Sequence, residues 1–201
     1  MQRTLIKKVV IIGPESTGKS TLCRQLAEHY NTIWCPEYAR EYLLKHGTNY
    51  TYDDLLTIAK GQIELEEKTI QLATGNKQPA NPNSPLTRHP EQSEGHHSPI
   101  FIDTDMYVMK VWCEFLFGKC HHFILDQIAK RKYDRYLLCN VDLPWVKDEL
   151  REYPELQTRQ KLYLIYKDIM ANQTFPWAEI SGNYEERLQN AIVAVDNLLT
   201  K

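Results

Sequence analysis

The stretch from Lys8 to Ser20, KVVIIGPESTGKS, decides the fold of this chain. It opens with a β-branched apolar run that does not alternate with polar residues, which is typical of a strand buried on both faces of a parallel sheet. From Gly13 onward it matches GxxxxGK[ST], the pattern of a glycine-rich loop between a strand and a helix. The residues from Thr21 to Ala27 continue as a predicted helix. The sequence therefore predicts a strand, a phosphate-binding loop and a helix in succession.

Phosphate binding requires this layout. Glycines let the backbone wrap around phosphates, and amides at a helix N-terminus donate hydrogen bonds to them. We expect Lys19 to reach the β- and γ-phosphates of ATP and the Ser20 hydroxyl to ligate Mg²⁺. The predicted nucleotide-binding residues of the loop are Gly13, Glu15, Ser16, Thr17, Gly18, Lys19, Ser20 and Thr21.

Four further apolar runs, separated by helix-like segments, complete a repeating pattern. They lie at residues 32–35, 100–103, 136–139 and 177–180. Strands that alternate with helices predict a doubly wound α/β sheet. The fold class is therefore a P-loop NTPase with a five-stranded parallel sheet flanked by helices, to which we add a small helical lid.

The composition fits one domain over residues 1–201. The formal net charge is −2, with 24 basic and 26 acidic residues, which gives no reason to expect a nucleic-acid partner. No apolar run is long enough to cross a bilayer, and the N-terminus does not resemble a signal peptide. The five cysteines lack metal-binding spacing. We expect a reduced, cytoplasmic protein; its oligomeric state does not follow from the sequence.

One segment interrupts the pattern. Residues 75–99 are rich in proline and histidine and contain only Leu86 as a large aliphatic residue. Such a segment buries too little apolar surface to offset its ordering entropy. We expect a disordered insertion, with a substrate lid or docking peptide as the alternative.

Carboxylates follow two of the predicted strands. Asp103 and Asp105 follow the strand at 100–103, at the edge where ligands of open α/β sheets bind. Asp103 is predicted to hold Mg²⁺, although both could instead cap a helix that starts near Thr104. Glu37 follows the strand at 32–35 and would face a phosphoryl acceptor, unless it forms a surface ion pair with Arg40.

A charge-rich segment from Asp142 to Arg151 follows the fourth strand. Arg151 and Arg159 are predicted to neutralise the transferring phosphoryl group from a mobile lid, the alternative being a solvated helix face. After the fifth strand, Gly182 lies in a turn that could contact the nucleotide base or simply connect strand to helix.

Two classes of P-loop protein compete. A GTPase switch would need DxxG after the third strand and NKxD after the fourth, and the chain has neither. An AAA+ machine would need more chain and further arginine fingers. A kinase for a small metabolite fits the size, because its catalysis is mostly positioning and electrostatics.

Several motifs, in order along nearly the whole chain, resemble the ribosylnicotinamide kinase domain of NadR-type bacterial regulators. They are the phosphate loop, Glu37-Tyr38-Ala39-Arg40-Glu41, Gly61-Gln62, Phe101-Ile102-Asp103-Thr104-Asp105 and Trp145-Val146-x-Asp148-x-x-Arg151. The resemblance implies a P-loop kinase that transfers the ATP γ-phosphate to the 5′-hydroxyl of nicotinamide riboside. The regulators' helix-turn-helix and adenylyltransferase domains do not fit in this length, so we expect a free-standing kinase.

The resemblance and the residue chemistry together nominate a site. Carboxylates and aromatic faces suit a cationic pyridinium. The predicted catalytic residues are Lys19, Asp103, Glu37, Arg151 and Arg159, and Ser20 and Asp103 are the predicted metal ligands. The predicted substrate-binding residues are Glu37, Tyr38, Arg40, Asp103, Asp105 and Trp112. The alternatives are a kinase for another nucleoside and a P-loop ATPase that acts as a regulatory or scaffold module.

Overall fold

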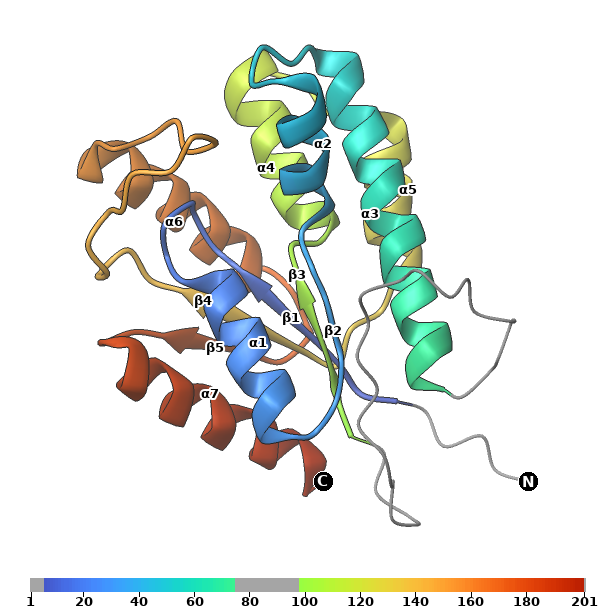
Figure 1. Cartoon of the computed structure of the whole chain (residues 1–201), viewed down its shortest axis with the longest axis vertical. Coiled ribbons are helices and arrows are strands. Elements are labelled where there is room, and N and C mark those ends of the chain that lie inside the picture. The colour runs from blue at the N-terminus through green and yellow to red at the C-terminus, as the bar shows by residue number, and fades with distance from the viewer. Residues whose placement is uncertain (1–5, 75–97, 201) are drawn as a thin grey trace.

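The computed structural model describes residues 6–74 and 98–200. Its centre is a five-stranded parallel sheet in the order β2-β3-β1-β4-β5 (Figure 1). The strands are β1 (Lys8–Ile12), β2 (Trp34–Cys35), β3 (Ile100–Asp103), β4 (Arg135–Cys139) and β5 (Trp177–Ile180). The described residues also form α1 (Lys19–His29), α2 (Tyr38–His46), α3 (Tyr52–Ala73), α4 (Met106–Phe117), α5 (His122–Lys130), α6 (Leu156–Ala171) and α7 (Tyr184–Leu199). The predicted P-loop fold with a five-stranded parallel sheet is confirmed.

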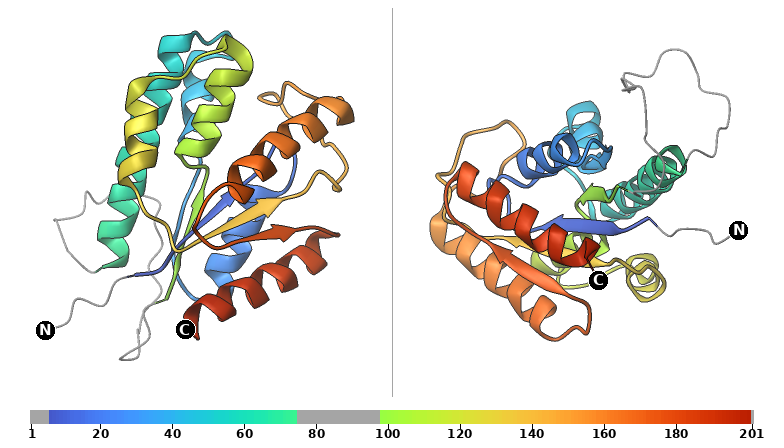
Figure 2. Two further views of the ribbon diagram at one scale, coloured as in Figure 1. Left: turned by 180° about the vertical axis from the view of Figure 1, so that it is seen from behind. Right: turned by 90° about the horizontal axis from the view of Figure 1, so that it is seen from below.

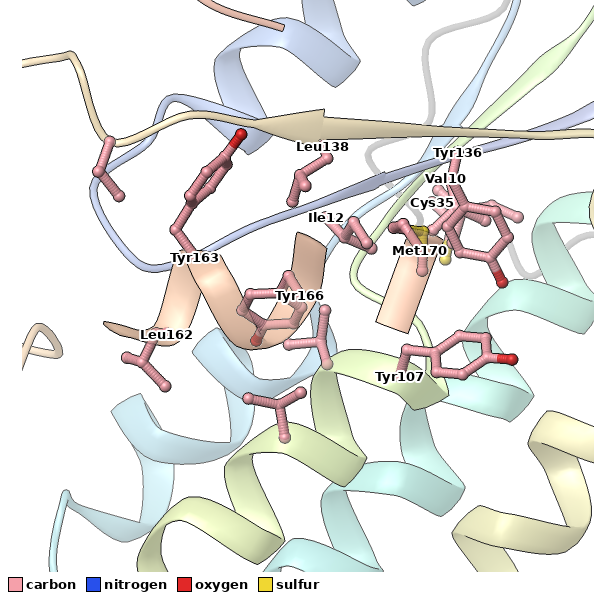
Figure 3. Close-up of a cluster of buried hydrophobic side chains, with 14 residues drawn as sticks. Val10, Ile12, Cys35, Tyr107, Tyr136, Leu138, Leu162, Tyr163, Tyr166 and Met170 are labelled. Atoms are coloured by element: carbon pink, nitrogen blue, oxygen red, sulfur yellow. The ribbon is translucent and has the colours of Figure 1, made fainter. Parts of the chain in front are cut away.

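The central strand β1 is buried on both faces, as its unbroken apolar run predicts. Val9 and Ile11 pack on the face covered by α1 and α7. Val10 and Ile12 pack on the opposite face, together with residues of α4 and α6. Figure 3 shows this second cluster, in which Tyr166 of α6 lies over the sheet. Burial on both faces fixes β1, and with it the start of the phosphate loop at its carboxyl end.

Helices α2, α3, α4 and α5 form a separate apolar cluster that rises above the carboxyl ends of the strands (Figures 1 and 2). Helix α3 begins with a capping box, in which the Thr51 side chain accepts from the backbone of Asp54 and the Asp54 side chain accepts from the backbone of Thr51. This box satisfies backbone donors that a helix start otherwise leaves free. The cluster forms the wall opposite the phosphate loop. None of the described helices is long and apolar enough to cross a membrane.

The predicted lid differs from the structure in one respect. Residues 140–155, which we call the strap, contain no helix between β4 and α6. The physical reason is that backbone N–H groups of Val146, Glu152 and Tyr153 donate to side chains of the phosphate loop and not to helical carbonyls. The predicted insertion at 75–99 lies outside the described residues except for Ser98 and Pro99, so the single domain with an insertion stays a prediction.

Candidate active site

The phosphate loop needs glycine at two positions. Gly13 has φ +140°, and a Cβ there would lie 2.7 Å from the carbonyl oxygen of Cys139. Gly18 has φ +77° and is the N-cap residue of α1. Both backbone conformations are ones that side chains with a Cβ rarely adopt. The two glycines let the loop pass close to β4 and then turn into α1, whose N-terminus faces the loop.

Polar side chains of the loop turn inward onto its own backbone. The Lys19 ammonium donates to the carbonyl oxygen of Pro14 at 2.8 Å, and the Thr17 hydroxyl donates to the same oxygen at 2.8 Å. Lys19 therefore lies across the mouth of the loop, on the side where phosphates bind in P-loop proteins.

Asp103 ends β3, the neighbour of β1 in the sheet. Its side chain is fully buried, and within the described part of the chain neither carboxylate oxygen has a hydrogen-bond partner. Burial raises the pKa of the Asp103 carboxyl above its ordinary value; the nearby charge of Glu37 adds to the rise, and Lys19 opposes it. A buried carboxylate without partners is costly, which means that a cation at this position would be strongly favoured.

Mg²⁺ fits these donors. The unpaired oxygens of Asp103 and the hydroxyl of Ser20 both line the same cavity, and hard oxygen donors suit this ion. Among the described residues, no group of three or more His, Cys, Asp or Glu side chains is placed to hold a metal. Mg²⁺ needs only a few protein ligands where water molecules and phosphate oxygens complete its coordination shell.

Glu37 stands at the N-terminus of α2, across from Asp103. Its Oε1 accepts a hydrogen bond of 3.2 Å from the hydroxyl of Thr104. Thr104 is buried and has φ +72°, a left-handed conformation that is rare for a β-branched residue. This turn of the backbone directly after β3 brings the Thr104 hydroxyl to Glu37.

The strap is tied to the phosphate loop through Glu15. The Glu15 carboxylate accepts from the backbone N–H of Glu152 at 2.9 Å, from that of Tyr153 at 2.6 Å and, more weakly, from the Trp145 indole at 3.4 Å. Next to it, the Ser16 hydroxyl accepts from the backbone N–H of Val146 at 3.0 Å. The predicted role of Glu15 was in nucleotide binding; its carboxylate here holds the strap.

The strap is also tied to the opposite wall. The guanidinium of Arg40 in α2 donates to both carboxylate oxygens of Asp148, at 3.0 and 3.3 Å. The Tyr50 hydroxyl donates to Glu152 at 2.7 Å and accepts from the Trp112 indole at 2.9 Å. Hydrogen bonds therefore run from the aromatic Trp112 through the strap to the phosphate loop.

Together these elements enclose a cavity of about 310 Å³. The phosphate loop forms one side, and α2, α4 and the strap form the other. The predicted site residues that line it, besides residues 13–21, are Glu37, Arg40, Asp103, Trp112 and Arg151. A larger open depression of about 720 Å³ between α4 and α6 contains none of the predicted site residues.

The two arginines predicted to belong to the lid lie in different environments. Arg151 lines the cavity, and its guanidinium donates to the carbonyl oxygen of Val146 in the strap. Arg159 lies in the first turns of α6 and is only 4% exposed. Its Nε and Nη1 have no hydrogen-bond partner in the described chain. An unpaired buried guanidinium favours the approach of an anion.

Four of the predicted site residues, Asp105, Tyr38, Gly182 and Arg159, are not among the described residues that line the cavity. Asp105 does not line the cavity: it caps α4 by accepting from the backbone N–H groups of Tyr107 and Val108, and it accepts from the Tyr136 hydroxyl. The backbone reversal at Thr104 separates it from Asp103, so the alternative of a helix cap holds for Asp105.

Tyr38 and Gly182 contact other parts of the protein, and their predicted binding roles stay predictions. The ring of Tyr38 packs on Gly61, where an added Cβ would lie 2.1 Å from it. The N–H of Gly182 donates to Asp142 at 2.6 Å, and its carbonyl oxygen accepts from Arg187 at 2.8 Å. Gly182 therefore belongs to a connection within the protein.

Sequence reasoning missed Arg187. This residue of α7 is 2% exposed and donates to the carbonyl oxygens of Thr17, Asn140 and Gly182, at 3.0, 2.8 and 2.8 Å, and to the carboxylate of Asp142. It fastens the phosphate loop to the ends of β4 and β5. A single arginine in a helix carries no local signal in the sequence that would reveal such a role.

Comparison with known proteins agrees with this geometry. The model of the AAA_28 family, an AAA domain, matches residues 8–80 and 86–187. The chain belongs to this family. The description of AAA_28 names a domain and no reaction, so the expectation of a kinase and not an AAA+ machine remains a prediction.

Among curated proteins, the chain is 24% identical over 199 residues to the trifunctional NAD biosynthesis/regulator protein NadR of Escherichia coli (strain K12), and equally to that of Salmonella typhimurium. These matches cover 96% of this AAA_28 chain and 43% of each relative. The chain therefore spans less than half the length of the curated relatives it matches. The resemblance to NadR stated from the motifs is confirmed.

Among solved structures, the chain resembles NadR protein in complex with NR, with a TM-score of 0.71 and 23% identity over 98% of this chain and 50% of that one. It resembles NadR in complex with NAD and AMP-PNP with a TM-score of 0.66, also at 23% identity. Thymidylate kinase from Ehrlichia chaffeensis gives a TM-score of 0.62 and 14% identity, over 94% of this chain and 98% of that one. At these identities the likeness establishes the fold.

Proposed function

We propose that this protein is an ATP-dependent nucleoside kinase that phosphorylates nicotinamide riboside to nicotinamide mononucleotide. The observation that carries the proposal is one cavity lined both by the phosphate loop and by the carboxylate residues Glu37 and Asp103. A phosphoryl donor and an acceptor hydroxyl could meet there in line, which is the main demand of phosphoryl transfer. The resemblance to NadR supplies the identity of the acceptor.

The 5′-oxygen of the riboside forms a bond to the γ-phosphorus as the bond from that phosphorus to the β–γ bridging oxygen breaks, and ADP leaves. Glu37 or Asp103 orients the hydroxyl and accepts its proton. Lys19 would exchange its bond to the Pro14 carbonyl for one to the phosphates.

Charge on the transferring phosphoryl group must be neutralised. Arg151 lines the cavity. Arg159 does not, but it is buried in α6, the helix whose Leu162 and Tyr166 line the cavity, and its Nε and Nη1 have no partner among the described residues, so both arginines are assigned to this role. Ser20 and Asp103 would hold Mg²⁺. When bound, this ion would supply positive charge that offsets the negative charge of the phosphates.

The acceptor side of the cavity suits a cationic aromatic ring. Trp112 lines this wall, and its indole N–H is already bonded to Tyr50, which fixes the orientation of its face. The carboxylate of Glu37 lines the same cavity. An aromatic face together with a carboxylate attracts a pyridinium ring. The positive charge of Arg40 on this side is balanced by Asp148.

The test is a substrate panel. Purified protein with ATP and Mg²⁺ is offered nicotinamide riboside, other nucleosides and thymidine monophosphate, and both ADP and phosphorylated products are quantified. We expect product with nicotinamide riboside. If product forms only with another acceptor, that acceptor is the substrate in place of nicotinamide riboside. ATP hydrolysis that no acceptor stimulates would favour the alternative of a regulatory ATPase.

Two variants test the role of the phosphate loop in phosphoryl transfer. Lys19→Ala is expected to keep the fold and to lose transfer by about 100-fold or more, because a charge that stabilises the transition state is removed. Lys68→Ala, on the exposed side of α3, is the matched control and should keep its activity. Unchanged turnover in Lys19→Ala would contradict the role of the loop.

A further inference from the structure

A single buried amide lies between the two carboxylates of the candidate site. Gln62, in the middle of α3, is 1% exposed. It sits beneath the carboxyl ends of β2 and β3, where the chain leaves the sheet toward Glu37 and Thr104. A polar group buried to this degree must satisfy its hydrogen bonds within the protein.

Both the oxygen and the nitrogen of the Gln62 side-chain amide form hydrogen bonds. Its Oε1 accepts from the backbone N–H of Tyr38 at 2.7 Å. Its Nε2 donates to the carbonyl oxygens of Pro36 and Asp103, each at 3.3 Å. The orientation of the amide follows from its partners, because a backbone N–H needs the amide oxygen and the two carbonyls need the NH₂ group.

These hydrogen bonds hold the backbone on both sides of Glu37. The side chain of Gln62 holds the carbonyl just before Glu37 and the N–H just after it, and it also holds the carbonyl of Asp103. Two strand ends are thereby tied to one rigid helix residue. The Thr104 hydroxyl adds a second link, from the residue after Asp103 to the carboxylate of Glu37.

We propose that Gln62 is the positioning residue that sets the separation of Glu37 and Asp103 for the acceptor hydroxyl. This inference rests on the proposed kinase function, to which it adds a residue that touches neither substrate nor metal. Positioning of this kind is consequential, because a displacement of about 1 Å can cost about 100-fold in rate.

Two substitutions test the proposal. Gln62→Glu keeps the shape but puts an oxygen opposite the carbonyls of Pro36 and Asp103, which repels them. Gln62→Met keeps most of the volume and removes the hydrogen bonds to Tyr38, Pro36 and Asp103, together with the longer one from Nε2 to the Cys35 Sγ at 3.6 Å. The matched control is Gln71→Met, at an exposed position of the same helix. For each variant the melting temperature, the affinity for an ATP analogue without Mg²⁺, and kcat and KM for the acceptor are measured.

We expect kcat to fall by about 10- to 100-fold in both Gln62 variants, with affinity for the ATP analogue within twofold of the parent. The control should match the parent in every measurement. A fall in nucleotide affinity equal to the fall in kcat would overturn the proposal, since a general loss of structure would act on both. Unchanged kcat in the folded variants would overturn it as well.

A crystal structure of Gln62→Met separates this inference from the kinase assignment. We expect the distance between the carboxylates of Glu37 and Asp103 to change by about 1 Å relative to the parent, whatever the acceptor is. An unchanged distance overturns the positioning role even if the protein is a kinase. A changed distance in a protein that phosphorylates no acceptor upholds the role and refutes only the proposed function.

Discussion

The carboxylate of Glu15 accepts a hydrogen bond of 2.6 Å from the backbone N–H of Tyr153, which lies 138 residues further along the chain. A second bond, from the N–H of Glu152, reaches the same carboxylate. The phosphate loop thus carries its own attachment point for the strap that covers the cavity. A change in the loop therefore acts on the strap directly.

The Glu15→Gln variant should loosen the strap. Hydrogen bonds to a charged acceptor are worth about 1.5–3 kcal/mol, so their weakening should speed amide hydrogen exchange at Glu152 and Tyr153 by about tenfold or more. Exchange is followed by mass spectrometry or NMR at neutral pH. Glu28→Gln, on the exposed face of α1, should leave both rates unchanged. Equal rates in Glu15→Gln and the parent would refute the attachment.

Arg187→Lys should destabilise the protein. Lysine keeps the charge but cannot present three nitrogens to the carbonyl oxygens of Thr17, Asn140 and Gly182 together. Loss of these bonds should lower the free energy of unfolding by about 1–3 kcal/mol, measured by urea denaturation. Arg24→Lys, in an exposed pair with Glu28, should change it by less than about 0.5 kcal/mol. If the two variants changed the free energy of unfolding equally, the three-nitrogen geometry of the Arg187 guanidinium would be unimportant for stability.

Gly61→Ala should destabilise the protein although alanine is the better helix former. An added Cβ would lie 2.1 Å from the ring of Tyr38, which must then move. The clash should lower the free energy of unfolding by about 1–3 kcal/mol. In the background of Tyr38→Ala, the same change should raise it by up to about 1 kcal/mol, because only helix propensity remains. A change of the same sign in both backgrounds would contradict this account.

Asp54 should make stability depend on pH. Hydrogen bonds from Tyr42 and then Thr51 lower the pKa of Asp54 to about 2 in the folded protein. Its carboxylate therefore contributes stability above its ordinary pKa of about 4, and this contribution is lost as pH falls toward 2.

The Asp54→Asn variant isolates this effect. Its melting temperature should lie below that of the parent at pH 7, and the difference should shrink between pH 4 and 2. Asp53→Asn, at the neighbouring exposed position, is the control. A difference that stays constant from pH 7 to pH 2 would rule out the titration of Asp54 as its cause.

Local sequence signals predicted most of the fold. The strands were visible because each is a continuous apolar run, and the loop because its glycines and Lys19 fall in a fixed pattern. The part of the predicted lid from Asp142 to Arg151 forms no helix, because backbone N–H groups of the strap donate to Glu15 and Ser16, which lie about 130 residues away in sequence. A pattern within the strap could not reveal them.

The candidate site was predictable only in part for a similar reason. The run from Asp103 to Asp105 offered two carboxylates, and only the backbone turn at Thr104 decides which one enters the cavity. Gln62 was visible as part of a motif, but its hydrogen bonds join segments from β2, α2 and β3. Contacts of this kind depend on how helices and strands pack against each other, and the spacing of residues within a single helix or strand does not reveal them.

The left-handed backbone of Thr104 has a consequence for how this site can change by mutation. A β-branched residue at φ +72° carries strain of about 1–3 kcal/mol, which glycine would relieve. Glycine would also delete the hydroxyl that reaches Glu37. Under the proposed kinase function, stability and activity therefore make opposite demands on this one position, and a search for more heat-resistant variants would select substitutions that weaken the proposed phosphoryl transfer.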